Sequence, residues 1–308
     1  MTSEGYFLSP DALAKALRGL GYFADEKTAL AVYLCHKLQK PLLVEGPAGV
    51  GKTELAKAVS VLTGKELIRL QCYEGLDAQS ALYDWNYRRQ FMRVKLLEKE
   101  EISLSDAEQQ IYSEEFLLKR PLLKAISGEK GSVLLIDELD RSDEEFESFL
   151  LEILSDWQIT IPEIGTVKAL SVPFTVITGN RVRELSDAVR RRCFYLWIDY
   201  PTPEREAEII NEKVPGISAA LVGQITAFIA ETRLADFDKK PGVAESIEWA
   251  KTLSVLHYDS LDADIVAKTL GVILKDKRDI EAAENSLSEF LEKMGVRSTI
   301  APKIAERK

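Results

Sequence analysis

The stretch from Pro41 to Ser60, PLLVEGPAGVGKTELAKAVS, limits the fold of this 308-residue chain more than any other. Its middle fits the phosphate-binding pattern GxxxxGK[ST]. Glycines allow positive φ angles and a close approach to a polyphosphate, and N–H groups at a helix N-terminus form an anion site. Contacts to the nucleotide are expected from Gly46, Pro47, Ala48, Gly49, Val50, Gly51, Lys52, Thr53 and Glu54.

The chemistry of this loop needs a buried strand before it and a helix after it. Leu42-Leu43-Val44 is an apolar run typical of a central parallel strand, and Glu54 to Leu62 has apolar residues at helical spacing. In that setting Lys52 would reach the β- and γ-phosphates, and the Thr53 hydroxyl would ligate Mg²⁺. The sequence therefore predicts a nucleoside triphosphate site.

Composition indicates which class of partner and which cellular compartment to expect. The net charge of −10 provides no overall field to attract nucleic acid or anionic lipid, so protein partners are expected. Cys35, Cys72 and Cys193 lie far apart with no CxxC or HxxxH spacing, which argues against a zinc site. No signal peptide or apolar stretch of membrane-spanning length occurs, so a cytoplasmic protein is expected.

Two adjacent carboxylates follow the next buried strand. The apolar run from Ser132 to Ile136 leads directly into Asp137 and Glu138. Ligands bind at the carboxyl ends of strands in open α/β sheets, so Asp137 is expected to hold the Mg²⁺ water shell beside Thr53. Glu138 is expected to polarise an attacking water. The alternative is an acidic turn that only caps the following helix.

Two further polar groups follow later strands. Asn180 ends the apolar run that begins at Pro173, and it is either a turn residue or a contact to the γ-phosphate or attacking water. The triplet Arg190-Arg191-Arg192 precedes the last apolar run. This triplet is either a solvated basic patch or an arginine finger that enters a neighbouring subunit.

The order of elements predicts an α/β domain followed by an all-helical one. The first domain would cover residues 1–200 and the second 201–308, because Pro201-Thr202-Pro203-Glu204 is a strong boundary signal and only helical patterns follow it. Three further segments are predicted, namely N-terminal helices within 9–38, a helical insertion at 73–120 and a short β-hairpin at 158–169.

Together these motifs resemble an AAA+ ATPase of the MoxR family. GPAGVGKT matches Walker A, LLIDE matches Walker B, TGN matches sensor 1, and an arginine precedes Cys-Phe at the end of the core. The pieces ELDRSDEEFESFLLEIL and AVRRRCFYLWIDYPTPERE look most like the CoxD-like branch, which is associated with maturation of carbon monoxide dehydrogenase.

The resemblance implies more than the residues alone do. It implies a P-loop core with a five-stranded parallel sheet in the order 5-1-4-3-2, a helical lid domain, and ATP with Mg²⁺ as cofactors. It also implies a ring homo-oligomer, usually a hexamer, a partner with a von Willebrand factor A domain, and a protein client that is remodelled or activated. Arg192 best matches the position of the arginine finger.

One part of the lid departs from the family pattern. Related lids carry a sensor 2 arginine at the start of a helix, where this chain has Val243. Either Lys240 supplies that charge from one turn earlier, or nucleotide sensing by the lid is weak. Two other functions fit the motifs, a P-loop kinase of a small molecule and a nucleotide-gated scaffold or DNA-acting loader.

Overall fold

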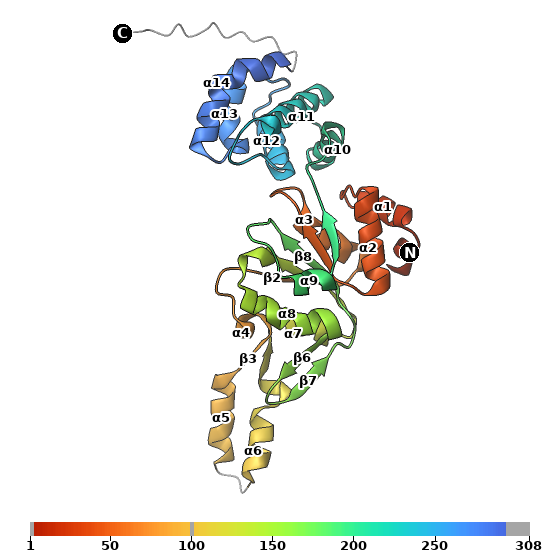
Figure 1. The fold of residues 1–308 in the computed structure, drawn as a ribbon, viewed down its shortest axis with the longest axis vertical. Helices are drawn as coiled ribbons and strands as arrows, with labels where there is room; N and C mark the ends of the chain where they lie inside the picture. Colours follow the sequence, from red (N-terminus) through yellow and green to blue (C-terminus); the bar gives the residue numbers. More distant parts are fainter. Residues whose placement is uncertain (1–2, 99–101, 294–308) are drawn as a thin grey trace, which may run out of the picture. The chain divides into compact units, whose positions relative to one another are not determined.

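The computed structural model describes residues 3–98 and 102–293, which fall into two compact units (Figure 1). The first unit ends at Ile198. The second begins at Asp199 and also takes in the short segments Gly21–Phe23 and Pro47–Gly51. Each unit has a hydrophobic core of its own.

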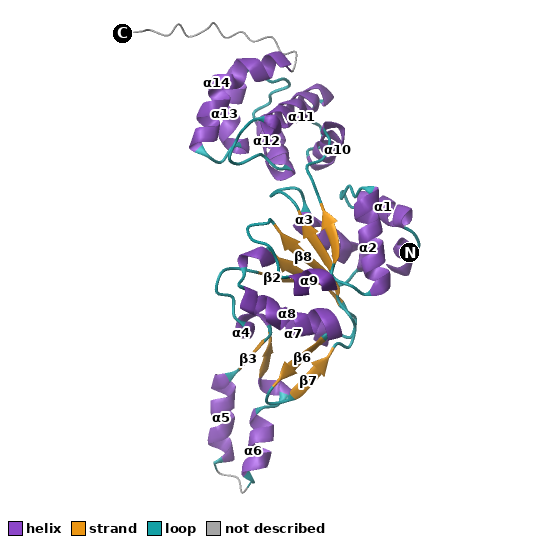
Figure 2. Ribbon diagram, in the orientation of Figure 1, coloured by secondary structure: helices purple, strands orange, loops and turns teal. Residues whose placement is uncertain are grey.

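A five-stranded parallel sheet forms the centre of the first unit (Figure 2). Its strands are β1 (Leu42–Glu45), β2 (Glu66–Gln71), β5 (Ser132–Asp137), β8 (Phe174–Gly179) and β9 (Phe194–Trp197). They lie in the order β2-β5-β8-β1-β9, which confirms the predicted order. Every residue of β1, β5 and β8 is buried, because helices cover both faces of the sheet, and such strands read as apolar runs.

Two layers of helices cover this sheet. In chain order the helices are α1 (Pro10–Arg18), α2 (Glu26–Leu38), α3 (Lys52–Thr63), α7 (Pro121–Ser127), α8 (Glu144–Asp156) and α9 (Asp187–Arg192), with short 3-10 turns η1 (Ser3–Phe7) and η3 (Leu139–Arg141). Helices α7, α8 and α9 share a core with alternate strand residues such as Leu43, Leu134 and Ile177. Helix α3 packs on β2, β5 and β8, and α2 packs on β1 and β9.

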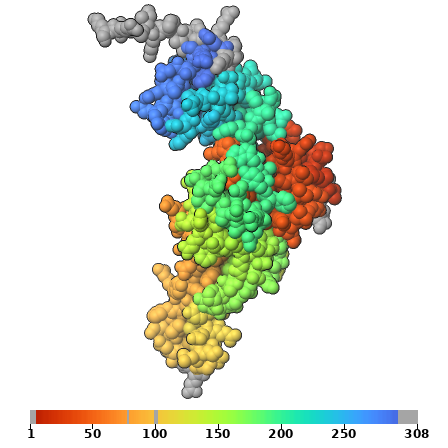
Figure 3. Space-filling model, in the orientation of Figure 1, coloured from red at the N-terminus to blue at the C-terminus, as the bar shows by residue number. Residues whose placement is uncertain are grey.

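Residues 73–120 form an excursion that extends away from the sheet of the same unit (Figures 1 and 3). Its elements are α4 (Ala78–Ala81), β3 (Tyr83–Trp85), α5 (Tyr87–Leu97), α6 (Leu104–Ile111), η2 (Glu114–Phe116) and β4 (Leu117–Lys119). The segment is not helical throughout, because β3 and β4 form a short antiparallel pair. Trp85 and Leu117 pair across it and are buried, which anchors both ends of the excursion in the core.

A second antiparallel pair follows α8 along the chain. Strands β6 (Gln158–Ile161) and β7 (Gly165–Lys168) form a hairpin within the predicted segment 158–169. Ile159 and Ile161 are buried while Thr160 between them is exposed, the alternation expected of a strand with one face on a core.

The second unit is built from helices in its described part. They are α10 (Pro203–Lys213), α11 (Ala219–Leu234), α12 (Val243–Val255), α13 (Ala263–Ile273) and α14 (Lys277–Lys293). Trp249 is fully buried at their centre, and its Nε1–H donates to the Thr269 hydroxyl at 2.8 Å. Of all the helices in residues 3–98 and 102–293, none is long and apolar enough to cross a membrane.

Candidate functional site

The phosphate-binding loop connects β1 to α3, the strand–loop–helix setting that its motif requires. Gly46, Gly49 and Gly51 have φ angles of 155°, 76° and 94°. A Cβ on Gly46 would lie 2.0 Å from the carbonyl oxygen of Ile198, so a side chain cannot be accommodated there. The Lys52 ammonium donates to the carbonyl oxygen of Gly46 at 2.7 Å, which places its charge at the loop.

The charge of Lys52 lies in a mostly buried, acidic environment. The residue is only 7% exposed, and this burial lowers the pKa of its ammonium. Asp140, Asp137, Glu138 and Glu45 act in the opposite direction, in decreasing order of strength. A cation held between a glycine loop and carboxylates is suited to bind a polyphosphate, because the phosphate oxygens then replace water as its partners.

Asp137, the last residue of β5, is buried beside the first turn of α3. The Thr178 hydroxyl donates to its Oδ1 at 2.6 Å, and the Thr53 hydroxyl lies 3.1 Å from the same oxygen. Mg²⁺ at nucleotide sites takes only one or two protein oxygens and completes its octahedron with phosphates and water, so this pair fits it. No cluster of three or more His, Cys, Asp or Glu side chains in the described chain could hold a metal alone.

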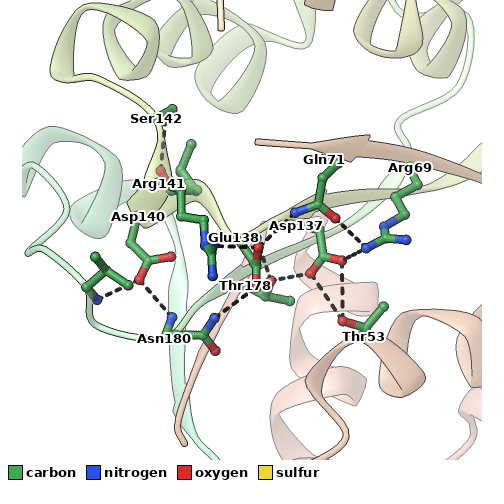
Figure 4. A network of polar contacts seen from close by, with 12 residues as sticks. Thr53, Arg69, Gln71, Asp137, Glu138, Asp140, Arg141, Ser142, Thr178 and Asn180 are labelled. Atoms are coloured by element: carbon green, nitrogen blue, oxygen red, sulfur yellow. Dashed lines mark hydrogen bonds and ion pairs between the residues drawn. The ribbon is translucent and has the colours of Figure 1, made fainter. Parts of the chain in front are cut away.

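Glu138 has an unusual backbone and a well-defined set of partners. Its φ of 57° is uncommon for a residue with a side chain, and such conformations concentrate at functional sites. Its N–H donates to the Thr178 hydroxyl at 2.9 Å. Asn180 Nδ2 donates to its Oε1 at 3.1 Å, and Gln71 Nε2 donates to its Oε2 at 3.0 Å (Figure 4). The carboxylate is thus held in one orientation while 30% of the side chain stays exposed.

The structure places Asp137, Glu138 and Asn180 at the carboxyl ends of adjacent strands, with Thr53 of α3 beside Asp137, and their roles at the nucleotide stay predictions (Figure 4). Other predicted contacts are less direct. Glu54 faces outward and pairs with Lys57 at 2.6 Å, so its role at the nucleotide stays a prediction.

Several residues of this network were missed in the sequence. The buried Asp140 accepts the N–H groups of Asn180 at 2.9 Å and Val182 at 2.8 Å through its Oδ2, so it holds the loop after β8. The alternative prediction was an acidic turn that caps the following helix. Asp143 does occupy the N-cap position of α8, but its side chain makes no capping hydrogen bond. Gln71 is the last residue of β2 and Thr178 the next-to-last of β8, at the same sheet edge as Asp137, and this shared position was the available signal.

The arginine triplet lies at the end of α9. Arg192 Nη1 donates to the carbonyl oxygen of Ala188 at 2.8 Å, and its Nε–H bonds to the hydroxyl of Ser155 on α8. Arg190 and Arg191 are exposed. Within the described residues, the contacts of Arg192 are made with α8 and α9 and not with Glu138. The role of Arg192 as a finger stays a proposal.

Within the second unit, the start of α12 lies against the loop segment Pro47–Gly51. The N–H of Ala244 donates to the carbonyl oxygen of Gly49 at 3.2 Å. A Cβ on Gly242 would lie 2.6 Å from the carbonyl oxygen of Ala48, so this approach depends on a glycine. Lys240 is exposed just before this point, and its role stays a prediction.

A buried ion pair holds the turn that precedes α12. The guanidinium of Arg233 contacts both carboxylate oxygens of Glu206, at 2.7 and 2.8 Å, and its Nε–H donates to the carbonyl oxygen of Pro241 at 2.9 Å. Glu206 is fully buried, so this pair fixes α10, α11 and the turn relative to each other.

Comparison with known proteins shows what the site is similar to. Residues 41–193 match the model of the AAA domain, dynein-related subfamily. Similar curated proteins include an uncharacterized protein of Staphylococcus haemolyticus, 23% identical over 276 residues that cover 86% of this chain and 95% of that protein. Another is an uncharacterized protein of Staphylococcus epidermidis, 25% identical over 261 residues that cover 82% and 90%.

Among solved structures, the RuvB Holliday junction branch migration motor of Thermotoga maritima is similar, with a TM-score of 0.46 and 19% identity. The match covers 93% of this chain and 84% of that one. A substituted form of the same RuvB protein gives a TM-score of 0.49 at 20% identity, covering 94% and 85%.

Proposed function

We propose that this chain is an ATPase that hydrolyses ATP to ADP and phosphate and thereby remodels a protein client, which the match of residues 41–193 to the AAA-domain model supports. The observation that carries the proposal is the position of Glu138. Its carboxylate is held by Asn180 and Gln71, partly exposed, at the sheet edge where the phosphate-binding loop begins. A fixed and accessible carboxylate beside a triphosphate site is suited to activate water.

The residues divide the hydrolysis step among them. Glu138 accepts a proton from the attacking water as the water oxygen bonds to the γ-phosphorus and the bond to the leaving ADP oxygen breaks. Lys52 binds the β- and γ-phosphates, and Asn180 donates to the charge that develops in the transition state. Asp137 and Thr53 would hold Mg²⁺, which supplies positive charge to the phosphates.

Phosphate release from ATP, measured without any added acceptor, tests this function. A small-molecule kinase would release little phosphate until its acceptor was added, so the assay separates the two enzymes. A DNA-acting loader would bind DNA in a salt-dependent way. The net charge of −10 argues against that function.

The finer assignment rests on the sequence resemblance. We propose a cytoplasmic MoxR-type ATPase of the CoxD-like branch that forms a hexameric ring. It works with a protein that contains a von Willebrand factor A domain. Its client would be a metalloenzyme similar to carbon monoxide dehydrogenase. An affinity pull-down with the Glu138→Gln protein and ATP tests this, because a protein arrested with ATP should retain its partners. Recovery of neither partner class would contradict the finer assignment.

Lys52→Ala is expected to weaken nucleotide binding about 10- to 100-fold, the usual effect of losing a charged hydrogen bond to phosphate. The fold should persist, because the substitution removes a phosphate contact and little of the core. Titration with a fluorescent ATP analogue measures the loss, and Lys57→Ala on the exposed side of α3 is the matched control. Equal affinity in both variants would contradict the role of Lys52.

Asn180→Ala is expected to slow hydrolysis by about 10-fold or more while ATP affinity changes little, because its amide contacts Glu138 and is proposed to stabilise the charge on the reacting phosphate. Turnover and melting temperature should be measured on the same preparation. A turn residue without a catalytic role would lower the melting temperature and leave the turnover of the folded protein unchanged.

A further inference from the structure

Arg69 on β2 contacts the carboxylate that is expected to face Mg²⁺. Its Nη2 lies 2.5 Å from Asp137 Oδ2, and the same nitrogen bonds to the side-chain oxygen of Gln71 (Figure 4). The Asp137 side chain is only 3% exposed, whereas that of Arg69 is 50% exposed. The arginine therefore reaches from solvent to a buried acid.

The contact meets an electrostatic need of Asp137. A carboxylate held away from water needs either a counter-charge or a full set of hydrogen bonds. Oδ1 has the short bond from Thr178, and Oδ2 forms an ion pair with Arg69. This partner would become a like charge beside Mg²⁺ once the metal shared the same carboxylate.

Arg69 is also connected to the general base. Gln71 accepts from Arg69 with its side-chain oxygen and donates to Glu138 Oε2 with its side-chain nitrogen at 3.0 Å. One guanidinium thus touches Asp137 directly and Glu138 through one amide. When the guanidinium moves, Gln71, which is one of the residues that hold Glu138, loses a hydrogen-bond partner.

We propose that Arg69 is a built-in counter-cation for Asp137 that competes with Mg²⁺ and leaves the carboxylate when Mg²⁺ binds with the nucleotide. Its departure frees Gln71 and so couples metal binding to the orientation of Glu138. Arg69 acts through Asp137 and Gln71 and is a positioning residue. This inference rests on the ATPase function proposed above.

Exposure makes this exchange feasible for Arg69. Its half-exposed side chain can swing into water, where the guanidinium is solvated at once. The Arg233–Glu206 pair in the second unit is the opposite case, because its side chains are only 9% and 1% exposed. If one of these side chains broke the ion pair, the other would remain as an uncompensated charge in the core.

The test is a Mg²⁺ titration of the binding of a fluorescent ATP analogue, which does not depend on turnover. Arg69→Gln is expected to lower the half-saturating Mg²⁺ concentration about 3- to 10-fold, because a competing charge next to the metal is removed. Arg69→Lys keeps the positive charge that competes with Mg²⁺, so its midpoint should stay within about 2-fold of the parent. Arg120→Gln removes a similarly exposed arginine that pairs with Asp84, away from the nucleotide loop, and should not change the midpoint.

Thermal unfolding without nucleotide gives a second readout. Arg69→Gln should lower the melting temperature when Mg²⁺ is absent, and added Mg²⁺ should reduce the difference from the parent. An unchanged midpoint in the analogue titration would overturn the inference, and a raised midpoint would show instead that Arg69 helps to hold the metal. If the parent protein binds no analogue at any Mg²⁺ concentration, the proposed ATPase function fails, and the inference fails with it.

Discussion

Arg192→Ala is expected to leave ATP binding unchanged and to reduce hydrolysis on the order of 10³-fold, the usual effect of removing an arginine finger. The reason is that a guanidinium from a neighbouring subunit would stabilise the charge of the transferring phosphoryl group. In the structure the side chain is held by Ser155 and the carbonyl oxygen of Ala188, so it has a defined position at the end of α9. Phosphate release and analogue binding separate the two effects.

A mixing experiment shows whether Arg192 acts in trans. Glu138→Gln subunits keep Arg192, and Arg192→Ala subunits keep Glu138, so neighbours of unlike type can form complete composite sites. The mixture should regain activity that neither variant has alone. Failure to regain activity in rings shown to be mixed would reject the finger. Equivalent substitutions at Arg190 and Arg191 then show whether another member of the triplet acts.

Glu138→Gln is expected to keep ATP binding and to slow turnover on the order of 10² to 10⁴-fold, because an amide cannot accept the proton of the attacking water. The substitution preserves the size of the side chain, so the contacts around it should largely persist. Single-turnover phosphate release measures the chemical step directly.

Glu145→Gln provides a matched control for Glu138→Gln. Glu145 is an exposed glutamate in the first turn of α8, and its substitution makes the same change of charge. The Glu145→Gln protein should hydrolyse ATP at the parental rate. If Glu138→Gln did so as well, another group would have to be the base.

Much of the fold could be predicted because the strands of a parallel sheet are buried on both faces. Continuous apolar runs gave the positions of β1, β5 and β8, and the resemblance supplied their order. The antiparallel pair β3–β4 was not predicted, because each strand has only three residues within a charge-rich stretch. Because α5 and α6 lie between β3 and β4 along the chain, local sequence patterns do not predict that these two strands pair.

The predictable part of the site consisted of residues that end apolar runs, such as Asp137 and Asn180. The contacts of Arg69 and Asp140 could not be foreseen, because they depend on register between strands and on the path of a loop. Arg69 precedes Asp137 by 68 residues, a stretch that includes the whole excursion, yet the pairing of β2 with β5 brings their side chains into contact. Spacing along the chain carries no information of this kind.

The order of the strands also affects how the protein can fold as it is synthesised. Leu42 of β1 pairs with Val176 of β8 and with Phe194 of β9, so both neighbours of the central strand come late in the chain. Closing such long loops costs entropy before any pairing compensates, which slows folding and exposes unpaired strand edges. A nascent chain that ends before β8 can pair β2 with β5, but β1 and the loop after it have no sheet to join. The nucleotide loop is therefore translated well before β8 and β9, the strands that β1 joins, and it becomes ordered only after them.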